Sequence, residues 1–422
     1  MILLFGTLFV LLLFGAPVFV AIGLSSCLYI IVNDLSIAMI AQRMVSGVDS
    51  FALLAVPFFI LAGAIMNEAR ITNRLYNFAN SMVAHWRGGL GHVNIYGSVI
   101  FSMMSGSALA DAAGLGAIQL KEMRERGYDL RFSVGTTGAT TVLAALIPPS
   151  LALVIYGFVA NVSVGRLFIA GILPGLLCAL ALHFTVFLVA RIKNLPAEAR
   201  HGWRARGRAL LVGLPALMTP VIILGSILMG IATPTEAAAA ASLYALFLGL
   251  AYRSLTLGSI LRVFRETFEL TATLMIIVAT SMLFGWILVF ENVARDFAAL
   301  LVTFATEPWH LLVILVIGLL IAGMFLDNIA VILLATPIVM PSVLQFGVDP
   351  VHFGVVMVLT LMIGLMTPPI GMILFVLARL SGLSFNGVFL ACVPFLIPLL
   401  VVIGLLIAFP QLVLVLPDWA FR

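Results

Sequence analysis

The sequence predicts an all-α, polytopic membrane protein that contains two inverted repeats, each with a re-entrant hairpin and a broken helix. Three observations lead to this fold class. Of the 422 residues, 63% are hydrophobic and 9% are charged, and the mean hydropathy is +1.25. Two long apolar runs are each interrupted by a Pro-Pro pair, at 148–149 and 368–369. Lys and Arg are concentrated beside the first pair and are absent from 299–378, which surrounds the second.

The composition excludes two broad classes of protein. A helix needs about 20 apolar residues to cross a bilayer core. This chain has many such runs, and no stretch of water-soluble composition is long enough to form a separate domain. A soluble enzyme is therefore excluded. A nucleic-acid-binding protein is excluded despite the pI of 9.2, because an excess of Lys and Arg in a membrane protein reports topology.

The cysteines and the N-terminal segment indicate no covalent cross-link and no cleaved leader. Cys27, Cys178 and Cys392 lie singly in apolar runs, and no CxxC pattern occurs. We therefore expect free thiols without a disulfide or a transition-metal site. Segment 2–32 lacks a basic n-region and is too long for a signal-peptide core, so we expect one retained spanning helix.

Eleven apolar segments follow one another along the chain, at about 2–32, 51–67, 91–126, 132–160, 165–192, 207–231, 234–252, 268–290, 309–346, 350–380 and 387–416. Two of them hold a polar interruption near the middle, SGSALAD (105–111) and FLDNIA (325–330). Irregular backbone at membrane depth is tolerated only where protein buries it or water fills a cavity. We therefore predict re-entrant hairpins at 91–126 and 309–346. The segments with Pro-Pro pairs, 132–160 and 350–380, are predicted to be broken helices because proline cannot continue a helix interior.

The two hairpin and broken-helix units match at an offset of 220 residues. The coinciding residues are Gly127 and Gly347, Asp129 and Asp349, Thr140 and Thr360, and Pro174 and Pro394. Their shared order favours an internal repeat. We expect residues 1–205 to hold the N-terminal helix and the first repeat. Residues 206–422 would hold connecting helices and the second repeat.

The charge distribution predicts the orientation of the repeats. The base of the first hairpin and the loop after the next helix carry ten basic residues: Lys121, Arg124, Arg126, Arg131, Arg191, Lys193, Arg200, Arg204, Arg206 and Arg208. The positive-inside rule places both on the cytoplasmic side. The base of the second hairpin has no Lys or Arg and is expected on the opposite side. Hairpins that enter from opposite faces are typical of a secondary transporter.

Three further stretches each have two interpretations. The amphipathic stretches 69–86 and 291–309 are interfacial struts or ordinary connecting helices. In TPTEAAAAASLYAL (233–246), Thr233 and Glu236 form a capping box with Pro234 at the first helical position. The alanines that follow would allow close helix packing. The alternative role for Glu236 is proton or cation coupling.

The broken helices and hairpin tips carry the groups suited to ion and substrate binding. A helix broken at mid-membrane frees backbone carbonyls, which suit Na⁺, and presents half-helix N-termini, which suit a carboxylate. The hairpin tips add Ser105, Gly106, Ser107 and Asp111 in one repeat and Asp327, Asn328 and Thr336 in the other. Two alternatives remain, because a Pro-Pro pair can simply kink a helix and either aspartate can simply cap one.

No known catalytic motif accompanies these groups. HExxH, GxSxG and Walker A patterns do not occur, and the six histidines are scattered. An intramembrane enzyme is therefore disfavoured, and no cofactor is expected. Without an ATP-binding module, transport would be driven by an ion gradient or by another chain.

Six runs of the sequence together resemble a known family. SGSALADAAGLGAI, IPPSLALVIYG, GRLFIAGILPG, TPTEAAAA, LDNIAVILLATPI and GVDPVHFGVV resemble, in order and over nearly the whole chain, the large permease subunit of tripartite ATP-independent periplasmic (TRAP) transporters. The resemblance implies Na⁺-driven import of an organic acid by an elevator mechanism across the bacterial inner membrane. It also implies two separate partners, a small membrane subunit and a periplasmic substrate-binding protein. A C4-dicarboxylate is the default substrate.

The resemblance also implies site residues. The first Na⁺ site would combine a hairpin side chain with carbonyls of the broken helix, at Ser105, Ala144, Ile147 and Pro149. The repeat offset places the second at Asp327, Gly364, Thr367 and Pro369. The substrate would lie between the hairpin tips, near Ser107, Asp111, Pro148, Ser150, Asn328 and Pro368.

One position departs from the family pattern, and one alternative function remains. The family commonly has glycine four residues before the first proline, where this chain has Ala144. A carbonyl ligand survives this change, but a backbone that needs positive φ would be strained. The alternative function is a stand-alone ion-coupled anion transporter or antiporter of related architecture.

Overall fold

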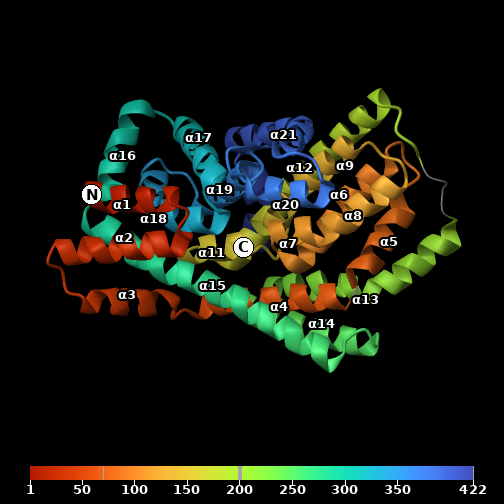
Figure 1. Cartoon of the computed structure of the whole chain (residues 1–422), viewed down its shortest axis with the longest axis horizontal. Helices are drawn as coiled ribbons and strands as arrows, with labels where there is room; N and C mark the ends of the chain where they lie inside the picture. The colour runs from red at the N-terminus through yellow and green to blue at the C-terminus, as the bar shows by residue number, and fades with distance from the viewer. Residues whose placement is uncertain (70, 198–201, 422) are drawn as a thin grey trace.

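The computed structural model describes residues 1–69, 71–197 and 202–421, and every regular element in these ranges is a helix. Eight of these helices are long and apolar enough to cross a membrane, or nine if the bent pair 130–146 and 151–159 counts as one span. The chain is therefore an all-helical, multi-pass membrane protein. Figure 1 shows α4, α13, α14 and α15 along one side of the molecule and the two hairpin units above them.

The N-terminal segment is not the single spanning helix that the sequence predicted. It forms α1 (Ile2–Leu13) and α2 (Val18–Val32), which pack against each other. Gly15 between them has φ +77°, and Pro17 precedes α2. A left-handed glycine followed by a proline ends the first helix, because neither continues helical geometry. Hydropathy did not indicate this turn, because residues 2–32 form one apolar run. A third helix, α3 (Ala38–Val48), then packs along α15 (Leu257–Phe290).

The helix that begins with TPTEA packs closely against its neighbour. A 3₁₀ turn (Phe51–Leu54) leads into α4 (Ala55–Glu68), which lies along α14 (Pro234–Ala251). Four alanines of α14 are fully buried, and the Ser242 hydroxyl donates to the Phe58 carbonyl at 2.7 Å. The capping box is confirmed, since Thr233 N donates to Glu236 Oε2 at 2.7 Å and Glu236 N donates to Thr233 Oγ1 at 3.3 Å. α13 (Trp203–Leu228) packs on the other side of α14.

Both amphipathic stretches form helices that lead into a hairpin. The first is α5 (Ile71–Val83), and the second is α16 (Val293–Phe304). α5 packs between α13 and the first hairpin arm, with Leu75 and Tyr76 buried, whereas α16 packs against the second hairpin. Their position relative to a membrane interface stays a prediction.

The first hairpin unit begins with α6 (Gly89–Ser105), which turns at Gly106 into α7 (Ala108–Ala113) and α8 (Leu115–Glu125). α6 packs against both α7 and α8. The broken helix follows as α9 (Leu130–Thr140), α10 (Leu143–Leu146) and α11 (Leu151–Val159), with a bend of 42° at the Pro-Pro pair. α12 (Val164–Ile192) completes the unit.

The second hairpin unit repeats this order. α17 (Pro308–Phe325) and α18 (Asn328–Gln345) form the hairpin, and α19 (Pro350–Gly364) and α20 (Met372–Ser381) form the broken helix. The predicted segment 387–416 is divided at Pro410 into α21 (Phe385–Ala408) and α22 (Gln411–Ala420). Figure 1 shows the second hairpin toward the end of the molecule where α16 lies, and the first toward the opposite end, beside α5.

Backbone features recur at the offset of 220 that the sequence indicated. Gly127 and Gly347 both have positive φ, at +74° and +68°. Asp129 and Asp349 both cap the next helix, and each Pro-Pro bond is cis. The units pack against each other through α9 with α21 and α12 with α19. α9 approaches α21 so closely that a Cβ on Gly135 would lie 2.0 Å from the Ala391 carbonyl oxygen.

Candidate ion and substrate site

The first broken helix is opened by its two prolines. Pro148 and Pro149 have no N–H for the carbonyls of Ala144 and Ala145, four residues earlier. The Ser150 hydroxyl replaces one lost bond by donating to the Ala145 carbonyl at 2.5 Å, and it accepts from Leu153 N at 3.2 Å. The carbonyl of Ala144 therefore lacks its intrahelical donor. Ser150 is fully buried and its hydroxyl caps α11, so it does not line an open surface.

The tip of the first hairpin rests directly on this break. The Gly106 carbonyl accepts a hydrogen bond from Leu151 N at 3.2 Å. Gly106 has φ +60°, and a Cβ there would lie 2.5 Å from the Pro149 carbonyl oxygen. The adjacent Ser105 hydroxyl is buried and has no hydrogen-bond partner within the described ranges. The structure thus places the first hairpin tip, which includes Ser105, against the Pro-Pro break of its own unit.

The departure at Ala144 causes no backbone strain. Ala144 lies in α10, and it is not among the residues with positive φ. The matching Gly364 also lacks positive φ, and a Cβ on it would lie 2.9 Å from Gly323 Cα. Glycine is therefore needed in the second unit because the hairpin backbone passes so close. In the first unit the fully buried Ala144 is accommodated with its side chain.

The second hairpin rests on its own broken helix in a similar way. The Met324 carbonyl accepts from Ile370 N at 3.2 Å and from Gly371 N at 3.4 Å. Gly371 corresponds to Leu151 at the repeat offset. Thr367 uses its hydroxyl to donate to the Ile363 carbonyl at 2.8 Å, within the same break. Two matched junctions between a hairpin tip and a broken helix are therefore present.

The two junctions differ in exposure. Residues 141–150 of the first break are all buried, which includes Pro148. In the second break Thr367 and Pro368 are half-buried, and Pro369 and Ile370 are exposed. The first junction is thus enclosed, and the second is open.

The two tip aspartates have different surroundings. Asp327 is the N-cap of α18, with Oδ2 accepting from Ile329 N at 3.1 Å, and Asn328 beside it is half-buried. Asp111 is 1% exposed, and neither of its carboxylate oxygens has a hydrogen-bond partner among the described residues. Ser107, not Asp111, caps α7 by accepting from Ala110 N at 3.4 Å. Capping therefore accounts for Asp327 and not for Asp111.

Each hairpin also contacts the broken helix of the other unit. α7, just beyond the first tip, packs against α10 of its own unit and against α20 of the second. α18, just beyond the second tip, packs against α19 and against α11 of the first unit. The region between the tips is therefore bordered by both broken helices. Thr336 lies deeper in α18, fully buried and within 3.7 Å of Met357 Sδ.

Comparison with known proteins decides the family. Residues 5–412 match the family model described as the DctM component of the tripartite ATP-independent periplasmic transporter. The chain belongs to this family of TRAP transporter permeases. Its function is thus transport and not enzymatic catalysis.

Two relatives agree with this assignment, and a solved structure shares the fold. The sialic acid TRAP transporter large permease protein SiaM of Vibrio cholerae is 44% identical over 96% of this chain and 95% of the relative. The C4-dicarboxylate TRAP transporter large permease protein DctM of Pseudomonas aeruginosa is 39% identical, covering 94% of each chain. A crystal structure of the Alcanivorax borkumensis YdaH transporter, described as having an unusual topology, matches with a TM-score of 0.65 and 14% identity over 89% of this chain and 88% of that one. The last comparison shows a shared fold.

Two sets of polar contacts in this TRAP permease were not predicted from the sequence, and the first is a buried network around Asn94. Asn94 of α6 donates to Thr137 Oγ1 at 2.7 Å and accepts from Thr140 Oγ1 at 3.0 Å, while Gln119 of α8 donates to the Asn94 carbonyl at 3.2 Å. This buried network ties both hairpin arms to α9. An isolated amide in an apolar run was the available signal, since buried polar groups in membranes need partners.

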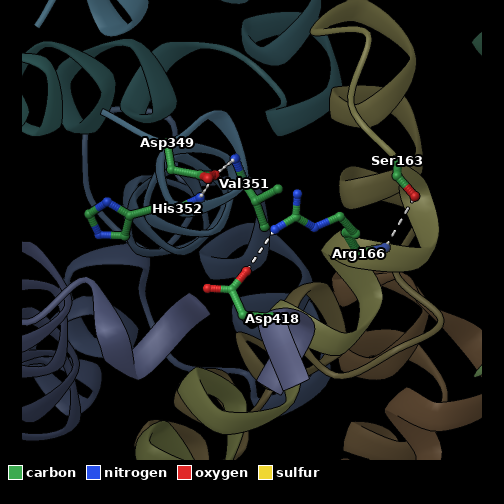
Figure 2. A network of polar contacts seen from close by, with 6 residues as sticks. All are labelled: Ser163, Arg166, Asp349, Val351, His352 and Asp418. Carbon is green, nitrogen blue, oxygen red and sulfur yellow. Dashed lines mark hydrogen bonds and ion pairs between the residues drawn. The ribbon is translucent and has the colours of Figure 1, made fainter. Parts of the chain in front are cut away.

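The second missed group joins the C-terminal helix to the first hairpin unit (Figure 2). Arg166 donates to Asp418 of α22 at 2.9 Å, and Ser163 caps α12 by accepting from Arg166 N at 3.4 Å. Nearby, Asp349 caps α19 by accepting from Val351 N at 2.7 Å. No sequence pattern paired residues 252 positions apart.

Proposed function

We propose that this chain is the permease subunit for Na⁺-coupled import of an organic carboxylate across the bacterial inner membrane. It would work with a small membrane subunit and a periplasmic substrate-binding protein, as the word tripartite in the family description suggests. The observation that carries the proposal is the pair of matched junctions, at Gly106 with Leu151 and at Met324 with Ile370. Broken helices that meet polar hairpin tips provide carbonyls for Na⁺ and half-helix N-termini for anions.

The enclosed junction would hold the first Na⁺. The Ser105 hydroxyl is buried without a partner among the described residues, and the carbonyl of Ala144 has lost its helical donor, so both oxygens are available to a cation. The carbonyls of Ile147 and Pro149 would complete the site. An unsatisfied buried oxygen costs about 1–3 kcal/mol, and a bound cation would remove that cost.

The open junction would hold the second Na⁺. Its ligands would be the Asp327 carboxylate and oxygens of Gly364, Thr367 and Pro369. Asp327 uses Oδ2 for the cap of α18, and a carboxylate has further acceptor sites for a cation. Because Pro369 is exposed, we expect this site to exchange its ion more readily than the enclosed one.

The substrate would lie between the hairpin tips. Ser107, Asn328 and Pro368 are half-buried there and are the accessible members of the predicted set. Pro148, Ser150 and Asp111 are buried, so they would support this surface without direct contact with the substrate. The names of the two relatives concern sialic acid and C4-dicarboxylates, both of which carry a carboxylate. Sialic acid is thus the first compound to test, ahead of the C4-dicarboxylate default.

The proposed movement is of the elevator type. Both hairpin units would move together against the helices α4 and α13–α15, because α9 with α21 and α12 with α19 join the units into one body. Gly63 of α4 touches the first tip, and a Cβ on it would lie 3.1 Å from Ser105 Cα. A small residue at this contact suits a surface that slides.

The test is transport into proteoliposomes that contain the chain, its small membrane subunit and its binding protein. We expect uptake of labelled substrate with an inward Na⁺ gradient and almost none when choline replaces Na⁺. Uptake unchanged in choline would refute Na⁺ coupling. Full uptake by the chain alone, without the binding protein, would instead favour a stand-alone ion-coupled anion transporter or antiporter.

A further inference from the structure

A cavity of about 370 Å³ lies at the base of the first hairpin, outside the proposed ion and substrate sites. Its walls come from α8, from the first residue of α9 and from the end of α20. The cavity therefore spans a seam between the first hairpin and the broken helix of the second unit. It is lined by Ala117, Leu120, Lys121, Arg124, Glu125, Leu130, Leu380 and Ser381.

The lining combines apolar walls with two basic side chains. Arg124 is exposed, and no ion pair is found for it among the described residues. Lys121 Nζ lies 3.9 Å from Glu125 Oε1, and both side chains are more than half exposed. Such an exposed pair contributes little and leaves the ammonium available. Of the other lining residues, Ala117, Leu120, Leu130 and Leu380 are apolar.

The cavity lies on the basic side of the protein. The end of α20 carries Arg379 in its last turn, and α9 begins with Arg131 as its second residue. Asp129, just before α9, pairs with Lys193 at the end of α12, where the basic loop begins. The positive-inside rule places this end at the cytoplasmic leaflet. Anionic lipids of that leaflet attract Lys and Arg near the surface.

The corresponding end of the second hairpin is different. A cavity of about 480 Å³ there is lined by α15, α16 and α18, and Arg295 is its single charged side chain among the described residues. The lining of the first cavity thus has two basic side chains and one acidic one, Glu125, whereas the lining of the second has one basic side chain, although both cavities lie beside a hairpin base. Of these two, the cavity at the cytoplasmic end combines two basic groups with leucine walls.

We propose that the cavity between α8 and α20 binds the phosphate headgroup of an anionic phospholipid from the cytoplasmic leaflet. Lys121 and Arg124 would contact the phosphate, and Leu120, Leu130 and Leu380 would contact the start of the acyl chains. A basic pocket between membrane helices on the cytoplasmic side is a known form of lipid headgroup site. Because the lipid would bridge α8 and α20, it would hold the first hairpin base against the second unit.

The test is binding of short-chain lipids to the purified full-length chain in a neutral detergent. The probes are dioctanoyl phosphatidylglycerol, dioctanoyl phosphatidylcholine and inorganic phosphate, and the readout is the apparent Kd. The variant carries Lys121→Gln and Arg124→Gln together. The matched control is Arg208→Gln, an exposed arginine of the same basic region on α13.

We expect phosphatidylglycerol to bind more tightly than phosphatidylcholine, with a loss of about 25-fold in the double variant, or about fivefold for each charge near the surface. The control should bind as the wild type does. A second variant, Leu380→Trp, keeps both charges but fills the cavity, and should weaken binding as well.

Three results would overturn the proposal: equal affinity of the double variant and wild type, equal loss in the Arg208→Gln control, or competition by inorganic phosphate at the same concentration as the lipid. The last result would mean a soluble-anion site instead of a lipid site. Unchanged thermal melting of each variant in phosphatidylcholine nanodiscs establishes that it is folded.

Discussion

Replacing Gly106 by alanine tests whether contact between the first hairpin tip and the broken helix supports ion binding. The alanine Cβ would lie 2.5 Å from the Pro149 carbonyl oxygen, and both groups are tied to backbone, so the tip must move away. The φ of +60° adds a cost of about 1–2 kcal/mol for a residue with a side chain. Loss of the bond from Leu151 N to the Gly106 carbonyl adds about 1 kcal/mol.

The sum is about 2–3 kcal/mol, which corresponds to a reduction in apparent Na⁺ affinity of about 30- to 150-fold. The assay is the Na⁺ concentration that gives half-maximal uptake in proteoliposomes that contain the partner proteins. The matched control is Gly127→Ala, because Gly127 has φ +74° but a Cβ added there would meet no atom within 4 Å. Gly127→Ala has the same conformational cost at a position outside both junctions, where that cost should not change the affinity for Na⁺. Wild-type Na⁺ dependence in Gly106→Ala, or an equal shift in both variants, would refute this reasoning.

Four other substitutions test the second junction, the Ala144 position, the Glu236 cap and the Asp129–Lys193 pair. Gly364→Ala should abolish uptake, because the alanine Cβ would lie 2.9 Å from the backbone of the second hairpin. At the matching position of the first unit, Ala144→Gly should retain uptake and lose about 1 kcal/mol of stability. Equal uptake by the two variants would contradict this difference in packing. Glu236→Gln should keep both uptake and melting temperature, since glutamine also completes a capping box, whereas loss of uptake would support a coupling role. Asp129→Asn should lower stability at pH 7 by up to about 1 kcal/mol, because Lys193 lowers the pKa of Asp129 in the folded protein. That contribution is present above the unfolded pKa of about 4 and is lost as the pH falls through the lower folded pKa. The difference in urea midpoint between Asp129→Asn and wild type should therefore vanish at acid pH. A difference that persists at acid pH would contradict a role for the ion pair.

The Pro-Pro pairs show how much of the fold could be predicted. Proline at 148–149 and 368–369 removes backbone donors whatever surrounds it, so the two breaks could be placed from the sequence alone. The first hairpin turn could be placed as well, because SGS interrupts an apolar run. The turn at Gly15 and Pro17 was missed, since hydropathy treats residues 2–32 as one segment and does not register chain reversal.

The contact between each hairpin tip and its broken helix could be predicted from the sequence, but the burial of the residues at that contact could not. The hairpin tip that contains Ser105 lies against the first break. Residue type does not indicate how deeply each group is buried. The difference in exposure between the buried Pro148 and the exposed Pro369 depends on how the helices pack around each break. The sequence also offered one choice, cap or binding group, for Asp111 and Asp327 alike. Their difference arises because Ser107 precedes α7 and takes the capping position there.

Equilibrium binding of ²²Na⁺ to the purified chain tests the central claim, that each junction holds one sodium ion, most directly. We expect two ions bound per wild-type chain, and one per chain in Ser105→Ala and in Asp327→Asn. Two bound ions in either variant, or none in the wild type, would contradict it.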